Sequence, residues 1–327
     1  MARFDRSAWQ VEFMAFYSES TWEGQIGNEP SDDSDTSSTI FVPLAYYLRP
    51  INERLHFGFT LLGIGYSDDL EDWPGRYFLQ TYESITVSAF PSLSFKVSDK
   101  FSIAGSLQLS YSSFEQERAV ANILDPGVAD GVSTIETDGF DVGWGASTLY
   151  QFSDRTRWGL AYLSELNPEL EGNNKFSNLG PNTEQILGAA GLLNADITVH
   201  TISPQSLVTG VYHEFENHHA FTVDLAWIDF SSFQLSEFYI NGDQLTQSEE
   251  VYEDIYALSA SYSFPLSSRW MLGISGMYTS DMIKDEHRTM TFRMESIRSL
   301  GIGAEWQWKD DRLVEFSLSY MDLGELF

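Results

Sequence analysis

Alternation of apolar and polar residues along residues 101–111 is the feature that most constrains the fold of this chain. The two registers are, on the apolar side, Phe101, Ile103, Leu107, Leu109 and Tyr111, and on the polar side Ser102, Ser106, Gln108 and Ser110. Side chains of a strand point alternately to its two faces, so this segment has one apolar and one polar face. It suits a sheet with water on one side and either lipid or a protein core on the other.

The same alternation returns in other segments of similar length. They are residues 9–17, 85–97, 140–152, 221–227, 256–264, 300–308 and 314–320. A strand that crosses a membrane needs about 9–11 residues, and a closed barrel satisfies every backbone polar group in lipid. The repetition predicts an all-β fold, an antiparallel transmembrane β-barrel. A soluble β-sandwich is the alternative, because its strands also alternate.

Composition narrows the class of protein. The chain has 327 residues without an apolar run long enough for a membrane-spanning helix, which argues against a helical membrane protein. A net charge of −30 with only 18 Lys and Arg residues argues against nucleic acid as a partner. The absence of cysteine fits export to an oxidising compartment. We find no linker between domains, so residues 1–327 are interpreted as a single barrel domain.

Short and long connections alternate along the chain. The short ones are residues 50–53, 98–100, 153–156, 216–219, 265–268 and 309–311, and the long ones are 21–38, 67–83, 113–139, 164–194, 241–254 and 280–296. Bacterial outer-membrane barrels have short turns on the periplasmic side and long loops outside. The count is about thirteen strands if residues 195–215 form one strand. Pro204 lies within that segment and leaves the alternative of two shorter strands.

Four runs carry a resemblance to a known family. They are FVPLAYYLRPINERLHFGF from Phe41, PSLSFKVSDKFSIAGSLQLSY from Pro91, GWGASTLYQFSDRTRWGLAYLSEL from Gly143 and GVYHEFENHHAFTVDLAWIDFSSF from Gly210. In this order and spacing they resemble the FadL family of outer-membrane transporters for long-chain fatty acids and other hydrophobic compounds. The resemblance covers nearly the whole chain. It implies a barrel of about fourteen strands with a plugged lumen. Ligand would bind in the lumen and leave sideways at a kinked third strand.

The two ends of the chain depart from the family pattern. The first six residues, MARFDR, lack the apolar region of a signal peptide. They resemble the segment that follows the family's amino-terminal hatch, and LVEFSLSYMDLGELF resembles its penultimate strand. We therefore expect the signal peptide, the hatch and the last strand to be absent. The strands at 9–17 and 314–320 should then run in the same direction beside an open seam.

Arg118, in the run YSSFEQER from Tyr111, is the principal candidate for binding a ligand. It resembles the position where the family places a basic residue against the fatty-acid carboxylate, and a guanidinium can donate two hydrogen bonds to one carboxylate. The alternative is a loop arginine paired to Glu115 or Glu117. A second basic position of the family aligns with Glu253, where an acid would repel a carboxylate. That departure leaves room for a neutral hydrophobic ligand.

Further residues are predicted to shape the lumen and the exit. Met14, Phe16, Phe90 and Leu149 should point into a ligand channel, whereas the lumen of a general porin would be almost wholly polar. Gly63 and Gly65 lie in the strand that resembles the kinked one, and interior glycines mark bends or close approaches; relief of crowding is the alternative. The tryptophans expected in interfacial girdles are Trp144, Trp227, Trp306 and Trp308.

Catalytic and metal-binding signals are weak. The six histidines show no zinc spacing, and Ser275 in GISGM lacks the spacing of a nucleophile elbow. Asp32, Asp33 and Asp35 could gather calcium, but the EF-hand spacing is absent and a solvated loop is the default. We predict a bacterial outer-membrane channel, not an enzyme, without a cofactor or bound metal. It would take up fatty acids or neutral hydrocarbons passively as a monomer, in contact with membrane lipid and lipopolysaccharide. A general porin and an outer-membrane lipase are the alternatives.

Overall fold

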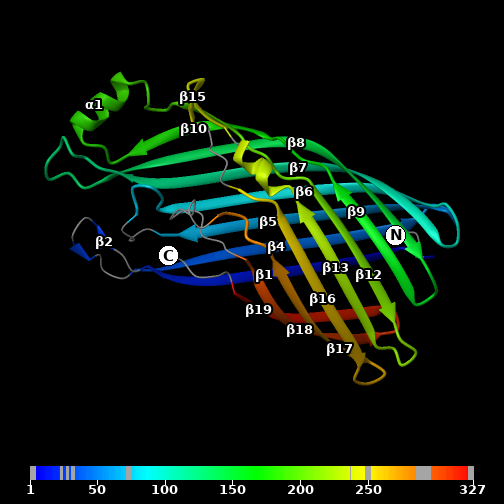
Figure 1. The fold of residues 1–327 in the computed structure, drawn as a ribbon. Helices are drawn as coiled ribbons and strands as arrows, with labels where there is room; N and C mark the ends of the chain where they lie inside the picture. Colours follow the sequence, from blue (N-terminus) through cyan, green and yellow to red (C-terminus); the bar gives the residue numbers. More distant parts are fainter. Residues whose placement is uncertain are drawn as a thin grey trace.

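A wall of thirteen antiparallel strands makes up most of the molecule (Figure 1). The computed structural model describes residues 5–22, 25–26, 29–30, 34–70, 75–235, 237–246, 252–284 and 296–322. In order around the wall the strands are β1 (Ala8–Trp22), β4 (Ser34–Pro50), β5 (Leu55–Asp69), β6 (Thr81–Lys96), β7 (Phe101–Val120), β8 (Gly131–Gln151), β9 (Thr156–Leu163), β12 (Ser206–Glu214), β13 (Ala220–Ile228), β16 (Ile255–Pro265), β17 (Trp270–Thr279), β18 (Arg298–Lys309) and β19 (Arg312–Asp322).

The sheet forks at β8. Residues 145–151 of β8 pair with β9, and residues 132–138 pair with β10 instead. The branch continues through β10 (Glu169–Ser177), β11 (Asp196–His200), β14 (Glu237–Ile240) and β15 (Asp243–Thr246), which brings the sheet to 17 strands. The branch lies at the long-loop end with helix α1 (Pro181–Ala189), away from the short turns (Figure 1).

Three small elements complete the described chain. A hairpin of β2 (Gln25–Ile26) and β3 (Glu29–Pro30) follows β1, and the 3-10 helix η1 (Phe230–Leu235) follows β13. Among the described residues, no helix is long and apolar enough to span a membrane.

Two expectations about strand limits are wrong. Residues 195–215 form two strands, β11 in the branch and β12 in the wall, with an isolated bridge between Ser203 and Leu166. Pro204 lies between them and has no N–H to donate to a ladder, which explains the interruption. Residues 113–139 are not a long loop either, because β7 continues to Val120 and β8 begins at Gly131. β7 and β8 pair with each other along this whole segment, and this pairing keeps both strands extended beyond the length that a membrane requires.

Burial along β7 confirms the predicted faces. Ile103 and Leu107 are 46% and 54% exposed, whereas Gln108 and Ser110 are 6% and 3% exposed. Inner side chains of a curved wall crowd one another, so the register of Gln108 and Ser110 is the inner face, called the lumen below. Polar side chains bond to each other there, as in the 2.6 Å contact between the hydroxyls of Ser88 and Ser110. A soluble sandwich would bury the apolar register instead, so that alternative is wrong.

Aromatic side chains gather on the outer face near the short turns. The rings of Trp270 and Trp306 stack 5.9 Å apart, and Trp308 lies 6.4 Å from Trp306. Lys309 and Arg312 lie over the ring of Trp308, at 5.1 and 5.7 Å. Trp144 and Trp227 share the outward register nearer the long loops, through pairing with Leu107 and Leu207. The predicted girdle tryptophans therefore all face outward.

Strands β1 and β19 run in the same direction, as the alternation predicts. The Gln10 amide donates to the Glu315 carboxylate across 3.2 Å, which places the two strands close to each other near the short turns. Between these two strands, as far as the structure describes them, no ladder of backbone hydrogen bonds is formed.

Spin labels test the two faces of β7. In lipid bilayers, oxygen should quench labels at residues 103 and 107 more than labels at 106 and 108, because oxygen concentrates in hydrocarbon and a strand alternates faces. A water-soluble relaxation agent should show the opposite order. Labels at Phe95 and Ser94, on the neighbouring β6, serve as the matched pair, since their backbone partners are Ile103 and Ala104. Equal accessibility at all positions would contradict a membrane wall.

Candidate functional site: a lumenal cavity and a break in the wall

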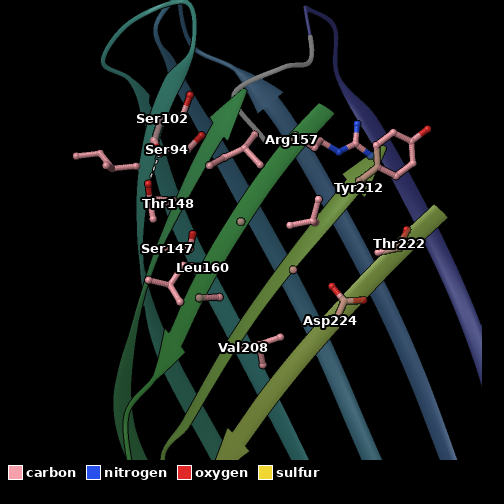
Figure 2. Close-up of a pocket in the computed structure, with 17 residues that line it drawn as sticks. Ser94, Ser102, Ser147, Thr148, Arg157, Leu160, Val208, Tyr212, Thr222 and Asp224 are labelled. Atoms are coloured by element: carbon pink, nitrogen blue, oxygen red, sulfur yellow. Dashed lines mark hydrogen bonds between the residues drawn. The ribbon is translucent and has the colours of Figure 1, made fainter. Parts of the chain in front are cut away.

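A cavity of about 460 Å³ lies against the lumenal face of β6 to β13, near the short turns (Figure 2). Ladder pairing joins Ser102, Leu149, Gly159, Gly210 and Asp224 in one row across five strands. Paired residues of neighbouring antiparallel strands point to the same face, so the whole row faces the lumen. This row forms the floor of the cavity.

Paired glycines make the centre of the floor low. Gly159 on β9 is the backbone partner of Gly210 on β12, so no side chain rises from either strand there. A Cβ atom on Gly210 would meet the Asp224 carboxylate, which shows that this carboxylate lies over the bare backbone of Gly210. Leu149 and Val208 give the cavity apolar walls. The floor is therefore bare backbone at Gly159 and covered by the Asp224 carboxylate at Gly210, and its sides are both apolar and polar.

Arg157 is the basic group of the cavity. It is half-buried, and its guanidinium lies 3.9 Å from the centre of the Tyr212 ring, on the neighbouring strand (Figure 2). Arg157 and Tyr212 are also backbone partners, so the register of the ladder brings their side chains together. A guanidinium on an aromatic face keeps its N–H groups in the plane of the fork, where they can donate to a carboxylate.

Asp224 and Ser94 supply the other polar groups. Asp224 accepts a 3.4 Å hydrogen bond from Ser259 and lies two strands from Arg157. The hydroxyl of Ser94, a residue 3% exposed, has no hydrogen-bond partner within the described part of the chain. A buried hydroxyl without a hydrogen-bond partner is unusual. Ser94 lines the cavity, so a molecule in the cavity could supply that partner.

The predicted lumenal residues all lie in the inward register. Leu149 lines the cavity itself. Met14 and Phe16 are paired with Val42 and Ile40 of β4, and Phe90 with Thr60 of β5, so these three point inward on other parts of the wall. Small polar or glycine residues dominate the inner face of β16 to β19. They are Ser259, Ser261, Ser275, Gly301, Gly303, Ser317 and Ser319. The lumen is thus apolar mainly on the side of β1, β4 and β5.

Arg118 lies far from the cavity. It sits near the long-loop end of β7 as the backbone partner of Ser133, and it is exposed. Sixteen residues of β7 separate it from Ser102, about 50 Å of strand. Within the described residues no ion pair joins it to Glu115 or Glu117, and its register is that of the inner face. The strand, not a loop, therefore positions this arginine.

Glu253 is paired with a base. Its carboxylate lies 3.5 Å from the Lys284 ammonium, and its N–H donates to the carbonyl of Met282. The negative charge of Glu253 is thereby compensated by a lysine on the neighbouring segment. Both side chains are about half exposed, so the pair contributes little to stability.

The ladder between β4 and β5 is broken next to Gly63 and Gly65. Phe41 pairs with Gly65 and Leu44 pairs with Leu62, but the residues between them on the two strands are not partners. Pro43 lies in this gap, without an N–H to donate. A Cβ atom on Gly63 would lie 2.9 Å from Cγ of Pro43, so the proline ring occupies the space above the glycine. The other side of β5 stays fully paired with β6.

The side chains of the aspartates suggested for calcium lie outside the part of the chain that the structure describes. Asp32 and Asp33 lie outside the described residues, and the structure describes only the backbone of Asp35, in β4. Over the part of the chain that is described, no group of three or more His, Asp and Glu side chains could hold a metal ion.

Hydrogen bonds link the long loops to one another. Asp125 accepts bonds from the backbone N–H groups of Asn182 and Thr183, at 3.1 and 2.9 Å, and from both side chains, and so caps α1 from another loop. Burial alone would raise the pKa of Asp125, but these bonds outweigh it and hold the pKa below its usual value. Asp130 accepts from Tyr77 at 2.7 Å and Arg76 at 3.2 Å, and these contacts hold its pKa low as well.

Reasoning from the sequence did not single out Arg157, Tyr212 or Asp224. Each lies in the inward register of its strand, where a polar side chain is a usable signal, but many serines of the chain lie in that register too. Their convergence depends on which strands pair and in what register, as in the pairing of Arg157 with both Gln151 and Tyr212.

Comparisons with known proteins point to one group. A family model described as "Outer membrane protein transport protein (OMPP1/FadL/TodX)" matches residues 1–325. The long-chain fatty acid transport protein of Escherichia coli O6:H1 is 20% identical over 336 residues, 92% of this chain and 74% of that protein. The crystal structure of a Pseudomonas aeruginosa FadL homologue superposes with a TM-score of 0.80 at 18% identity, covering 98% of this chain and 82% of that one. A monoaromatic hydrocarbon channel, CymD, gives a TM-score of 0.70 at 17% identity, covering 98% and 85%.

Proposed function

This chain belongs to the OMPP1/FadL/TodX family of outer membrane transport proteins, and on that premise we propose that it takes up long-chain fatty acids passively through its lumen and releases them sideways between β4 and β5. Members of this family are outer-membrane β-barrels that transport hydrophobic compounds. The choice of fatty acids follows the curated relatives, which are named for that transport. The protein would act as a monomer in contact with membrane lipid, without catalysis.

The observation that carries the proposal is the position of the ladder break. Apolar inner side chains lie on the three strands around it. They are Met14 and Phe16 on β1, Leu44 on β4, and Leu62 and Ile64 on β5. An apolar chain that moves along them stays out of water until it reaches the gap between Pro43 and Gly63. A general water-filled porin has no need of an apolar strip that ends at a break in its wall.

The break suits passage of a lipid tail. Unpaired backbone groups in a barrel wall are costly in hydrocarbon, so such a gap is retained only where something compensates it. Pro43 removes one donor from the gap, and its ring covers Gly63 on the outer face. A small displacement of this ring would open the wall without breaking a backbone hydrogen bond of that residue. Opening the wall at the gap should therefore cost less free energy than opening it between two fully paired strands.

A neutral ligand is the second candidate. The long-loop end holds Glu253 where the family has a base, and the chain as a whole carries a net charge of −30, which opposes the approach of anions. The hydrocarbon channel among the similar structures has neutral ligands by its name. Against this, Lys284 compensates Glu253, and Arg118 and Arg157 offer two cations on the inner face.

Replacement of Arg118 by alanine separates the two candidates. For a fatty-acid channel, R118A should bind palmitate about 10-fold to 100-fold more weakly and bind hexadecanol unchanged, because a charged hydrogen bond contributes about 1.5–3 kcal/mol. Binding is measured on purified full-length protein in mild detergent. Lys175→Ala is the matched control, since this cation lies at the same end and pairs with Glu136 in the outward register. If R118A loses nothing for either ligand, Arg118 has no role in binding.

A further inference from the structure

As far as the structure describes the membrane wall, Arg49 is the one Lys, Arg, Asp or Glu residue in its outward register. That register consists of every second residue of 9–17, 41–49, 55–65, 85–95, 101–113, 140–150, 156–162, 207–213, 221–227, 256–264, 270–278, 300–306 and 314–320. A charged side chain on a lipid-facing surface is costly unless it reaches the headgroups. We propose that Arg49 binds the phosphate of an anionic glycerophospholipid in the periplasmic leaflet of the outer membrane.

A row of aromatic side chains places Arg49 at the depth of the headgroups. Trp9, Tyr47 and Phe59 are ladder partners in one outward row, and all three rings are exposed. Such rings mark the level where hydrocarbon meets the headgroups. Arg49 follows Tyr47 by two residues on β4 and so lies one row nearer the short turns. From there its long side chain reaches the lipid phosphates.

The guanidinium of Arg49 has no acidic partner among the described residues. Its side chain is exposed, and no ion pair joins it to a carboxylate in that part of the chain. The neighbours in its ladder row, Phe57 and Leu93, are apolar. A guanidinium can donate two parallel hydrogen bonds to one phosphate. The membrane lipid is therefore the nearest source of its counter-charge.

Two neighbouring turns add positive charge beside this arginine. The turn between β4 and β5 carries Glu53 and Arg54, and the turn between β6 and β7 carries Lys100. Lys96, at the end of β6, forms an ion pair of 3.0 Å with Asp99. With the arginine on β4, this part of the surface holds four bases and two acids, in a chain with a net charge of −30. The local excess of positive charge attracts an anionic headgroup.

Hydrogen bonds hold the backbone of Arg54 between these two turns. The Asn52 side chain accepts the N–H groups of Arg54 and Leu55, both at 2.9 Å. The carbonyl of Arg54 accepts the N–H of Lys96 at 2.8 Å, which joins one turn to the other. Lys96 and, to a smaller extent, Arg54 hold the pKa of Asp99 below its usual value. The charges of the two turns therefore act on one another and form one basic surface.

Selectivity at this site should come from the headgroup. Leu61 and Leu93 are exposed on the outer face beside the arginine and give the acyl chains an apolar surface. Any phospholipid makes that contact, whereas only an anionic one gains from the basic groups. Pro43, at the ladder break, is six residues from Arg49 along β4, about 20 Å. The inference therefore does not depend on which compound the lumen carries.

Native mass spectrometry of the full-length protein in mild detergent tests the site. The probes are phosphatidylglycerol and the zwitterionic phosphatidylethanolamine with the same acyl chains. Wild type should bind phosphatidylglycerol about fivefold more tightly, the change expected from one basic residue near an anionic lipid surface. R49A should abolish this preference and leave binding of phosphatidylethanolamine unchanged. R49K should fall between wild type and R49A, because lysine keeps the charge and loses the planar fork.

Arg155→Ala is the matched control. Arg155 also lies on a short turn, but it is paired with Glu216 at 3.3 Å, so R155A should keep the preference of wild type. Circular dichroism checks that each variant keeps its strand content. Equal binding of the two lipids by wild type, or a preference that survives in R49A, overturns the inference. Either result leaves the proposed transport standing, because uptake through the lumen does not involve Arg49.

Discussion

A disulfide that joins β4 to β5 beside the ladder break should reduce fatty-acid uptake by about tenfold or more and leave binding unchanged. The pair is F41C with G65C, whose Cα atoms face each other as ladder partners next to the gap. Antiparallel partners lie about 4.5–5.5 Å apart, within the range that a disulfide spans. Because the chain has no cysteine, this bridge would be the only one. It ties the strands where lateral release requires them to part.

The control bridge uses the same two strands away from the gap. Tyr47 and Phe59 are ladder partners on the same outward face, and Y47C with F59C should leave uptake at the wild-type level. Uptake is measured with labelled palmitate in proteoliposomes, before and after reduction. Recovery on reduction of the first bridge shows that the closed gap caused the loss. Normal uptake through the oxidised first bridge would rule out release between β4 and β5.

Removal of the Asp125 carboxylate should release α1 from the neighbouring loop. Four hydrogen bonds from Asn182 and Thr183 end on this one side chain, and none of the α1 side chains is buried. Leu124 and Asn122 accept one further bond each at the start of the helix, from Asn182 and Gly180. In D125A the amides of Asn182 and Thr183 should exchange with solvent at least about tenfold faster, by hydrogen-exchange mass spectrometry. Asp130→Ala, on the same loop, should leave these amides protected, because Asp130 bonds Arg76 and Tyr77 instead.

The same contact depends on pH in a definite direction. The hydrogen bonds hold the pKa of Asp125 below its unfolded value of about 3.9, so the stabilisation is complete well above that pH. It is lost as the pH falls through the lower folded pKa. Exchange of the α1 amides should therefore be constant from neutral pH to about pH 5, after correction for intrinsic rates, and accelerate below pH 4. D125N, which has no charge to lose, should show no such step.

Local pattern was sufficient to predict the faces of the wall. The inward and outward registers follow from period-two alternation, which each strand carries in its own residues, and Ser110 and Ile103 lie as that pattern requires. The fork at β8 has no such local signal. Whether a given residue of β8 pairs with β9 or with β10 depends on partners far along the chain, and the segment before Pro204 was assigned to the wall for that reason.

The site was predictable only in part. Leu149 was identified from its register and lines the cavity, whereas Arg157 and Tyr212 acquire their meaning from a cross-strand contact. The sequence marks Gly63 as an unusual strand residue, and its role as an exit stays a prediction. The cause of the irregularity, however, is Pro43 on the strand opposite, and a single strand read alone cannot reveal what its neighbour lacks. Whether Arg118, Met14, Phe16 or Phe90 contacts ligand stays a prediction.

The fork also divides the molecule into parts that can change independently. Below it, each strand of the wall except β1 and β19 is paired with a neighbour on both sides, and a slip of one residue would move its outward side chains to the inner face. Above the fork, the branch of β10, β11, β14 and β15 is paired with the wall along one strand edge, residues 132–138 of β8. Insertions, deletions or exchanges in that branch need to preserve this one edge and the hydrogen bonds that join α1 to the loop between β7 and β8. The sequence of the branch at the long-loop end can therefore change to suit a different environment or ligand while the sequence of the membrane wall stays the same.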